Sequence, residues 1–322
     1  MTRIGFSYNV KDPSFKNSDL HAEYETPETI AAIARTLSAY GDVVSLPCDA
    51  TLLSRLVSDP PGLMFNIAEG WGGRDRESFV PALCSMLGIP CTGSDAAVLA
   101  LTMDKALTKH ILRDAGIRTP GFIVCRDIPL LPPPFGFPAF VKPNCDGSSR
   151  GICGKSLVSG MDSFRERVGV ILEKYEQPAL VEPYLEGRDF CVGLLGNDPP
   201  GVLRTCEVLL GHEEGIPFFS YEYKRCETDM LDMSPAGTDT ALMEEMALLA
   251  WNILGCRDYA RLDFRTDSKG VPFLLEVNAL PGLSPVSGIF VRQAAASGIT
   301  FDELIGKIFE RVLKTSHPVP FS

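Results

Sequence analysis

Over residues 4–88, short apolar runs alternate with amphipathic stretches of helical length. The apolar runs have the length of strands and lie at residues 4–8, 43–46 and 63–67. Residues 27–41 begin with Pro27 and end with Gly41, which is the usual order of helix start and stop residues, and residues 81–88 form a shorter apolar helix that ends in glycine. This alternation predicts a small parallel sheet with helices on its faces.

A second region, residues 96–180, has its own start and stop signals. Asp104 is a good N-cap for a helix that Gly116 ends. Five prolines between Pro129 and Pro138 exclude a helix there, and the apolar run at 139–142 has the character of a strand. Together with a second predicted helix at 162–175, these elements indicate a small separate unit.

From residue 181 onwards, β-type segments dominate and two helices interrupt them. Residues 240–254 predict a helix that Gly255 ends, and residues 301–314 predict a final helix. The apolar stripe expected on the first of these consists of Leu242, Met243, Met246, Leu249, Ala250 and Ile253. We therefore expect a mixed α/β protein in three parts, at residues 1–95, 96–180 and 181–322.

The composition is that of an ordinary globular protein. The 322 residues are 45% apolar and 22% charged, and 30 basic against 41 acidic residues give a net charge of −11. A chain with this apolar content excludes disorder as the main state, and the acidic balance argues against nonspecific binding of nucleic acid. Ten cysteines occur without any CxxC pair, and neither an apolar leader nor a run of membrane-span length is present. We expect a cytoplasmic protein with reduced thiols and without a nucleic-acid or membrane partner.

The strongest chemical signal lies at residues 259–278. Alternation along a strand places Arg261 and Asp263 on one face, and it places Glu276 and Asn278 on one face of the following run. If the two runs pair as a hairpin, a guanidinium, two carboxylates and an amide oxygen come together. Oxygen ligands of this kind suit Mg²⁺, and the guanidinium would neutralise a developing anion. The solvated polar face of an edge hairpin would show the same alternation, so periodicity alone leaves both interpretations open.

A loop rich in glycine and serine, VKPNCDGSSRG at residues 141–151, follows an apolar strand that contains Lys142. Backbone N–H groups of such a loop, with a lysine beside them, are suited to binding phosphate. The loop also matches GxSxG, the nucleophile turn of serine hydrolases, but residues 152–159 after it have the character of a strand rather than the required helix. GICGKS is not a P-loop, because two residues rather than four separate its glycines. An ordinary glycine hairpin is the alternative.

A third loop, FNIAEGWGGRDRE at residues 65–77, follows another apolar strand. Gly72 and Gly73 permit a ligand to approach the backbone closely, and ligands of α/β folds bind at the ends of parallel strands. Glu69 lies at the beginning of this loop. A flexible connection without any ligand would have a similar composition.

Taken in order, these segments resemble the D-alanine–D-alanine ligase-type members of the ATP-grasp superfamily, from about residue 64 to the C-terminus. The motifs are EGWGGRDRE, IPCTGSD, TMDK, FVKPNCDGSSRG, VEPYLEGRDF, SYEYK, MSPAG, YARLDF and LLEVNALPGLSPVS. The resemblance implies an ATP-grasp fold behind an N-terminal Rossmann-like domain, with residues 96–180 as a lid and residues 181–322 as the catalytic unit. It implies ATP and two Mg²⁺ ions (Mn²⁺ being an acceptable substitute), amino-acid or peptide substrates, and a homodimer.

The resemblance also implies roles for individual residues. ATP would be bound by Lys105, Lys142, Glu182, Tyr184, Leu185, Asp189 and Lys224. The metal ions would be held by Asp263, Glu276 and Asn278. Arg261 and the N–H of Gly282 would form the oxyanion site, and Ser148 would close over the γ-phosphate. Ser287 would hold the carboxylate of the second amino acid. Glu23, with Glu25 as second choice, would bind the ammonium of the first.

Four features depart from the family pattern, and all four concern the amino-acid pockets. The first loop is long and polar. Glu69 stands where the family usually has His, and Arg225 stands where it usually has Tyr. Gly288 replaces the Leu that usually follows the carboxylate-binding serine. An extra carboxylate and an extra cation imply that at least one substrate differs from alanine.

The implied reaction joins a carboxylate to an amine through an acylphosphate and releases ADP and phosphate. D-Ala with D-Ala is the first substrate pair to expect. A ligase that makes a dipeptide or natural product from another substrate is the close alternative. An ATP-binding sensor without catalysis is the alternative of another class, and the combination of metal ligands with Arg261 argues against it.

Overall fold

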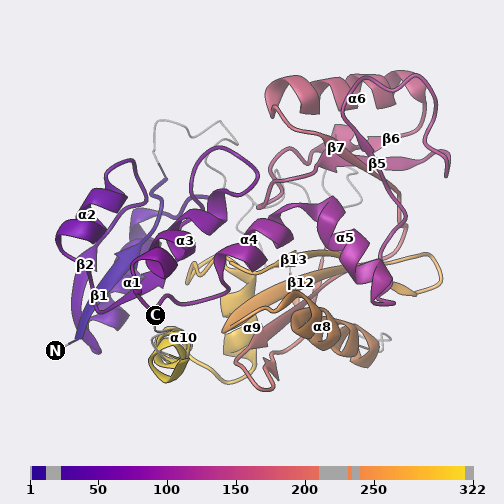
Figure 1. Ribbon diagram of the computed structural model, residues 1–322. Coiled ribbons are helices and arrows are strands. Elements are labelled where there is room, and N and C mark those ends of the chain that lie inside the picture. Colours follow the sequence, from indigo (N-terminus) through magenta and orange to yellow (C-terminus); the bar gives the residue numbers. More distant parts are fainter. Residues whose placement is uncertain (1, 12–22, 210–230, 234–239, 316–322) are drawn as a thin grey trace.

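The computed structural model describes residues 2–11, 23–209, 231–233 and 240–315 (Figure 1). Three sheets, each with its own helices, make up the described chain. In Figure 1 the N-terminal sheet lies on the left, a small sheet under α6 lies at the upper right, and the longest sheet lies between and below them. Within the described ranges, no helix combines the length and the apolar character that crossing a membrane would require.

The N-terminal sheet is parallel, as the alternating pattern predicts. Its strands β1 (Thr2–Ser7), β2 (Gly41–Ser45) and β3 (Leu63–Asn66) pair in the order β2-β1-β3. The helices around it are α1 (Pro27–Leu37), α2 (Leu52–Ser58) and α3 (Phe79–Met86). Because parallel strands are buried on both faces, β3 is apolar almost throughout and completely buried.

The small sheet is antiparallel and is covered by one helix. Its strands β4 (Ile123–Cys125), β5 (Ala139–Pro143), β6 (Leu157–Val158) and β7 (Ala179–Pro183) pair in the order β4-β7-β5-β6. Helix α6 (Met161–Lys174) buries Phe164, Val168 and Ile171 against it. The connection from the N-terminal unit consists of α4 (Ala96–Met103) and α5 (Lys105–Asp114). Asp104 caps α5 by accepting the N–H of Leu107, as predicted.

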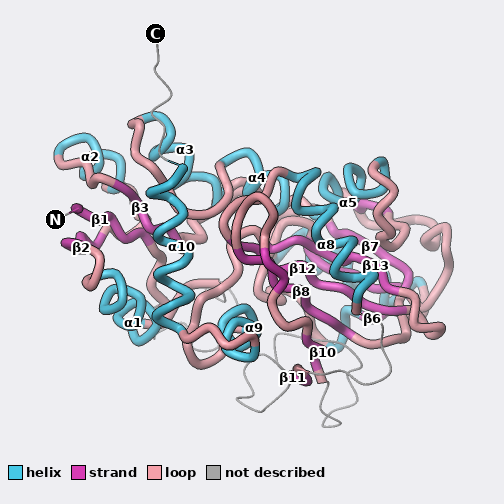
Figure 2. Tube along the Cα trace, turned by 90° about the horizontal axis from the view of Figure 1, so that it is seen from below, coloured by secondary structure: helices cyan, strands magenta, loops and turns pink. Residues whose placement is uncertain are grey.

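The longest sheet is also antiparallel. Its order is β11-β10-β8-β12-β13, with β9 paired to β8. The strands are β8 (Asp189–Leu195), β9 (Gly201–Val202), β10 (Cys206–Val208), β11 (Leu231–Asp232), β12 (Tyr259–Thr266) and β13 (Pro272–Asn278). Helices α8 (Ala241–Leu254) and α9 (Ile289–Ala296) pack on this sheet. The last helix, α10 (Phe301–Thr315), returns to pack against α1 (Figure 2).

Three local expectations from the sequence are wrong. Helix α1 ends at Leu37, and Gly41, expected to end it, is the first residue of β2. Helix α8 buries Met243, Met246 and Ala250 as expected, but Leu242, Leu249 and Ile253 are 39–46% exposed, and Ala247, Trp251 and Leu254 are buried instead. Apolar residues cover so much of this helix that periodicity does not determine which face is buried. After Ser149, residues Gly154–Ser156 form a 3₁₀ turn rather than a strand, and only Leu157–Val158 is strand. No helix follows the serine, so the nucleophile turn of a hydrolase is absent here.

Gly255 ends α8 in the left-handed region, with φ of 75°. We expect Gly255→Ala to lower the free energy of unfolding by about 1–2 kcal/mol, because a Cβ disfavours that conformation. The measurement is urea denaturation followed by far-UV circular dichroism. Gly121→Ala is the matched control, because Gly121 lies outside the helices and strands, does not have a left-handed φ, and an added Cβ would meet nothing within 4 Å. Equal losses in the two variants would contradict the prediction.

Candidate active site

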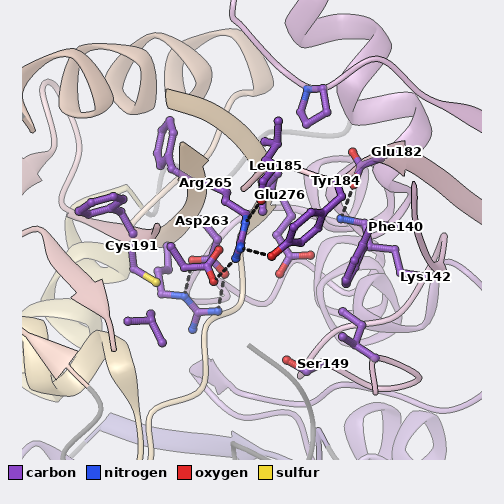
Figure 3. Close-up of a pocket in the computed structure, with 18 of the residues that line it drawn as sticks. Phe140, Lys142, Ser149, Glu182, Tyr184, Leu185, Cys191, Asp263, Arg265 and Glu276 are labelled. Carbon is purple, nitrogen blue, oxygen red and sulfur yellow. Dashed lines mark hydrogen bonds and ion pairs between the residues drawn. The ribbon is translucent and has the colours of Figure 1, made fainter. Parts of the chain in front are cut away.

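Two cavities meet above the middle of the longest sheet. The hinge cavity lies between the small sheet and β12–β13, and its lining includes Lys142, Tyr184 and Asp189 (Figure 3). The carboxylate cavity opens towards the N-terminal unit, and its lining includes four glutamates of that unit, Glu23, Glu25, Glu69 and Glu77. Arg261, Asp263 and Glu276 line both cavities, so the polar face of the hairpin is where the cavities join.

The hairpin brings together the four residues singled out at positions 261–278. In the β12–β13 register, Asp263 faces Glu276 and Arg261 faces Asn278, so all four side chains lie on one face of the sheet. Arg261 Nε and Nη2 donate to the two oxygens of Asp263, at 2.8 and 2.9 Å. Asn278 Nδ2 donates to Asp263 Oδ2 at 3.0 Å. Strand β12 lies between β8 and β13, and this face lines the cavities, so it is not the solvated face of an edge hairpin.

The charges around Glu276 keep it ionised. Lys105 Nζ lies 3.3 Å from Glu276 Oε2. Burial acts to raise the pKa of Glu276, but Lys105, Lys142 and Arg261 outweigh it and lower that pKa to about 2. Two opposed carboxylates and an amide oxygen form a donor set that fits Mg²⁺. Asp263, Glu276 and Asn278 are thus chemically suited to a divalent cation, although Asp263 is paired here with Arg261.

A buried ion group lies on the small-sheet side of the hinge cavity. Glu182, on β7, has Lys142 Nζ 2.9 Å from its Oε2 and Lys109 Nζ 2.7 Å from its Oε1. The Lys142–Glu182 pair is visible in Figure 3. Lys109 also donates to Thr119 Oγ1 at 2.8 Å. Sequence reasoning singled out Lys142 and Glu182 but missed Lys109, whose partner lies 73 residues along the chain.

Arg265 fixes the segment that follows Glu182. Its guanidinium donates to Leu185 O at 2.6 Å, to Asp189 Oδ2 at 2.6 Å and to the Tyr184 hydroxyl at 3.0 Å (Figure 3). Arg265 therefore holds three residues that the resemblance assigned to ATP binding, and sequence reasoning missed this arginine. The signal was available, since Arg265 continues the alternation of Arg261 and Asp263 along β12.

The glycine-rich loop is closely connected to the N-terminal unit. Ser148 and Ser149 lie in the left-handed region, with φ of 50° and 57°, and both line the carboxylate cavity. The N–H of Gly147 donates to Glu23 Oε1 at 2.6 Å. Arg76 Nη2 lies 2.7 and 2.6 Å from the two oxygens of Glu23, and its Nη1 donates to Cys145 O at 3.1 Å. Sequence reasoning also missed Arg76, although it lies within the motif EGWGGRDRE.

Three of the four glutamates gather at one point. Glu23, Glu69 and Glu77 each contribute an oxygen, and these oxygens lie within 4.8 Å of one another. Burial and the charge of Glu23 raise the pKa of Glu77 to about 8, and burial and Glu77 raise that of Glu69 well above its ordinary value. Burial also acts on Glu23, but Arg76 outweighs it and lowers that pKa. The cluster therefore combines one carboxylate whose pKa is lowered with two whose pKa values are raised.

The other side of the carboxylate cavity is formed by the segment after β13. A Cβ built on Gly282 would lie 3.5 Å from Glu25 Oε1, so the two residues are close neighbours there. Ser287 Oγ donates to Ser284 Oγ at 3.1 Å. A Cβ on Gly288 would lie 2.6 Å from Ser284 O, which explains why this chain has no larger residue there. Lys224 and Arg225, singled out in the sequence, lie outside the described residues.

Comparisons with known proteins agree with this geometry. Residues 131–310 match the family model described as D-ala D-ala ligase C-terminus. An uncharacterized protein, y4sG of Sinorhizobium fredii, is 36% identical over 81% of this chain and 79% of its own length. The D-alanine–D-alanine ligase of Oleidesulfovibrio alaskensis is 35% identical over 74% of this chain and 76% of its own length. The D-alanine–D-alanine ligase of Caulobacter vibrioides is 34% identical over 87% of this chain and 86% of its own length.

A solved structure shows the same fold. The crystal structure of D-alanine–D-alanine ligase from Bacillus anthracis complexed with ATP superposes with a TM-score of 0.76 and covers 98% of both chains. Its sequence identity to this chain is 22%. The likeness establishes the ATP-grasp fold that the sequence motifs implied.

The raised pKa of Glu77 predicts how stability depends on pH. Between about pH 4.5 and 8 the folded state keeps a proton that the unfolded state loses, so this group makes the protein less stable as pH rises through that range. We expect Glu77→Gln to raise the melting temperature, with a gain that grows between pH 5.5 and 8.5. Differential scanning calorimetry at several pH values tests this. Glu28→Gln, on the exposed face of α1, is the control. A gain independent of pH would contradict the prediction.

Proposed function

Because the chain belongs to the D-alanine–D-alanine ligase family, whose members are ATP-dependent ligases that form carbon–nitrogen bonds, we propose that it joins the carboxylate of one amino acid to the amine of a second substrate through an acylphosphate. The observation that carries the proposal is the junction of the two cavities at Arg261, Asp263 and Glu276. A nucleotide in the hinge cavity and an amino acid in the carboxylate cavity would meet at this point.

ATP would occupy the hinge cavity. The backbone from Glu182 to Leu185 would contact adenine, and Asp189 would contact the ribose hydroxyls. The phosphates would extend towards Lys105 and Lys142. Ser148 and, outside the described residues, Lys224 would close over them. Two Mg²⁺ ions held by Asp263, Glu276 and Asn278 would offset charge on the transferring phosphoryl group.

The two chemical steps would use different groups of the chain. In the first, a carboxylate oxygen of the first substrate attacks the γ-phosphorus and ADP leaves, while Lys105 and Lys142 offset charge. In the second, the amine attacks the acyl carbon and phosphate leaves. The tetrahedral oxyanion between them would accept hydrogen bonds from Arg261 and from the N–H of Gly282. Closing the glycine-rich loop would keep water away from the acylphosphate.

The carboxylate cavity supports a first substrate with an ammonium group. Glu23, Glu69 and Glu77 would surround that ammonium, and its charge would lower the raised pKa values of Glu69 and Glu77. On the opposite side, Ser287 would hold the carboxylate of the second amino acid, with Arg225 also near the substrates. The surplus of acidic groups favours the alternative in which the first substrate is not alanine. Residues 1–95 would then bind this substrate, residues 96–180 would form the lid, and residues 181–322 would carry catalysis.

The proposal predicts release of ADP that depends on both Mg²⁺ and an amino acid. We expect Asp263→Asn to lower kcat by on the order of 10²-fold or more, because the ligands that hold the ion beside the phosphoryl group lose a full negative charge. A coupled ADP assay measures kcat and the dependence of ADP release on Mg²⁺ and amino acids. Mass spectrometry identifies the products formed from mixed D- and L-amino acids. Asp162→Asn, exposed on α6, is the control and should keep full activity. Failure of every amino acid and dipeptide to stimulate ADP release would sink the proposal.

Glu69 provides a test of substrate choice. We expect Glu69→His to shift the ranking of first substrates away from the wild-type preference, because a partly buried carboxylate is replaced by a ring of different charge and shape. The measurement is kcat/KM across the amino acids that the mass-spectrometric screen identifies. Arg74→Gln, on the same loop with a side chain 67% exposed, is the control. An unchanged ranking would show that Glu69 does not contact the substrate.

A further inference from the structure

Lys109 is a buried lysine behind the hinge cavity, with no role in the mechanism above. Its side chain is 1% exposed. It lies on α5 one helical turn after Lys105, so both ammonium groups leave the same face of the helix. Lys142 and Glu182 line the hinge cavity, whereas Lys109 lies behind them. A lysine is rarely buried to this extent unless it is paired, so its partner is the key to its role.

The partner, Glu182, is shared between two lysines. Phe140 on β5 faces Glu182 on β7, and Lys142 lies two residues from Phe140 on the same face. Lys142 and Glu182 are therefore diagonal neighbours on the face of the small sheet that lines the hinge cavity (Figure 3). Lys142 Nζ lies 2.9 Å from one oxygen of Glu182, and Lys109 Nζ lies 2.7 Å from the other.

The charges of this group do not cancel. One carboxylate faces two ammonium groups, which leaves an excess of positive charge beside the hinge cavity. Burial lowers the pKa of Lys109 to about 8; Glu182 opposes this shift and Lys142 adds to it. Glu276, from β13, also favours the charged form of Lys109, but less than Glu182 does. Thr119 only accepts a hydrogen bond from Lys109 with its hydroxyl. Burial acts to raise the pKa of Glu182, but both lysines outweigh it and lower that pKa.

We infer that Lys109 is a positioning residue for nucleotide binding, which shares the carboxylate of Glu182 and so leaves the charge of Lys142 available to a phosphate of the nucleotide. This inference rests on the proposed nucleotide site. Without Lys109, both oxygens of Glu182 would face Lys142 alone. The carboxylate would then neutralise Lys142 and repel the phosphates.

The test compares the nucleotide affinity of the wild type, a single variant and a double variant, measured by calorimetric titration of ADP with Mg²⁺ in the absence of amino acids. We expect Lys109→Met to raise the Kd for ADP at least tenfold. We expect the double variant Lys109→Met/Glu182→Gln to return the Kd to within about threefold of wild type, because the carboxylate that neutralises Lys142 is gone. A lysine that only stabilised the fold would leave the Kd of the folded variant unchanged.

Two further variants complete the design. Lys155→Met removes an exposed lysine of the small-sheet unit, 78% exposed and paired with Glu166, and should leave the Kd unchanged. Lys109→Gln repeats the experiment with an amide that can keep the bond to Thr119, should the methionine variant fail to fold. A wild-type Kd in the single variants, or a double variant as weak as the single ones, overturns the inference. A wild-type protein that binds no ADP contradicts the proposed function instead.

Discussion

The register between β12 and β13 is the constraint on which the site depends. Asp263 faces Glu276 and Arg261 faces Asn278 only in this register. Because side chains alternate between the faces of a sheet, a slip of one residue would turn the polar set away from the cavities and into the core. The core opposes such a slip, since Leu262, Phe264, Leu274 and Val277 are buried on the other face. The apolar half of each strand thus fixes the position of the polar half.

Around that hairpin, most buried charges are shared rather than paired one to one. Glu182 serves two lysines, Asp263 accepts from Arg261 and Asn278, and Glu23 is held by Arg76 and a backbone N–H. Several donors lower the pKa of Glu23 and Glu182 despite the burial of both carboxylates. At Glu69 and Glu77, burial and neighbouring carboxylates raise the pKa instead. The local supply of donors therefore distinguishes the first two carboxylates from the last two.

Local signals in the sequence predicted much of the fold, and distant partners account for what they missed. Asp104 and Gly255 act within one helical turn, so their roles as helix start and stop were predictable. The polar face of the β12–β13 hairpin was predictable because alternation along a strand is a local pattern. The buried face of α8 was not, because apolar residues cover too much of the surface of this helix. Arg76, Lys109 and Arg265 were missed because their carboxylate partners lie between 53 and 76 residues away along the chain. Family motifs located the cavities but not these buried partners.

The contact between Glu23 and Gly147 has a consequence for the loop that follows β5. A flexible loop must lose conformational freedom when an anion arrives, at about 1–2 kcal/mol for each residue fixed. In this protein an internal carboxylate already sits on the loop's N–H, and Arg76 keeps it there. The N–H of Gly147 is consequently already occupied in the folded chain. Any anion that uses this N–H must first displace an oxygen that the chain itself supplies.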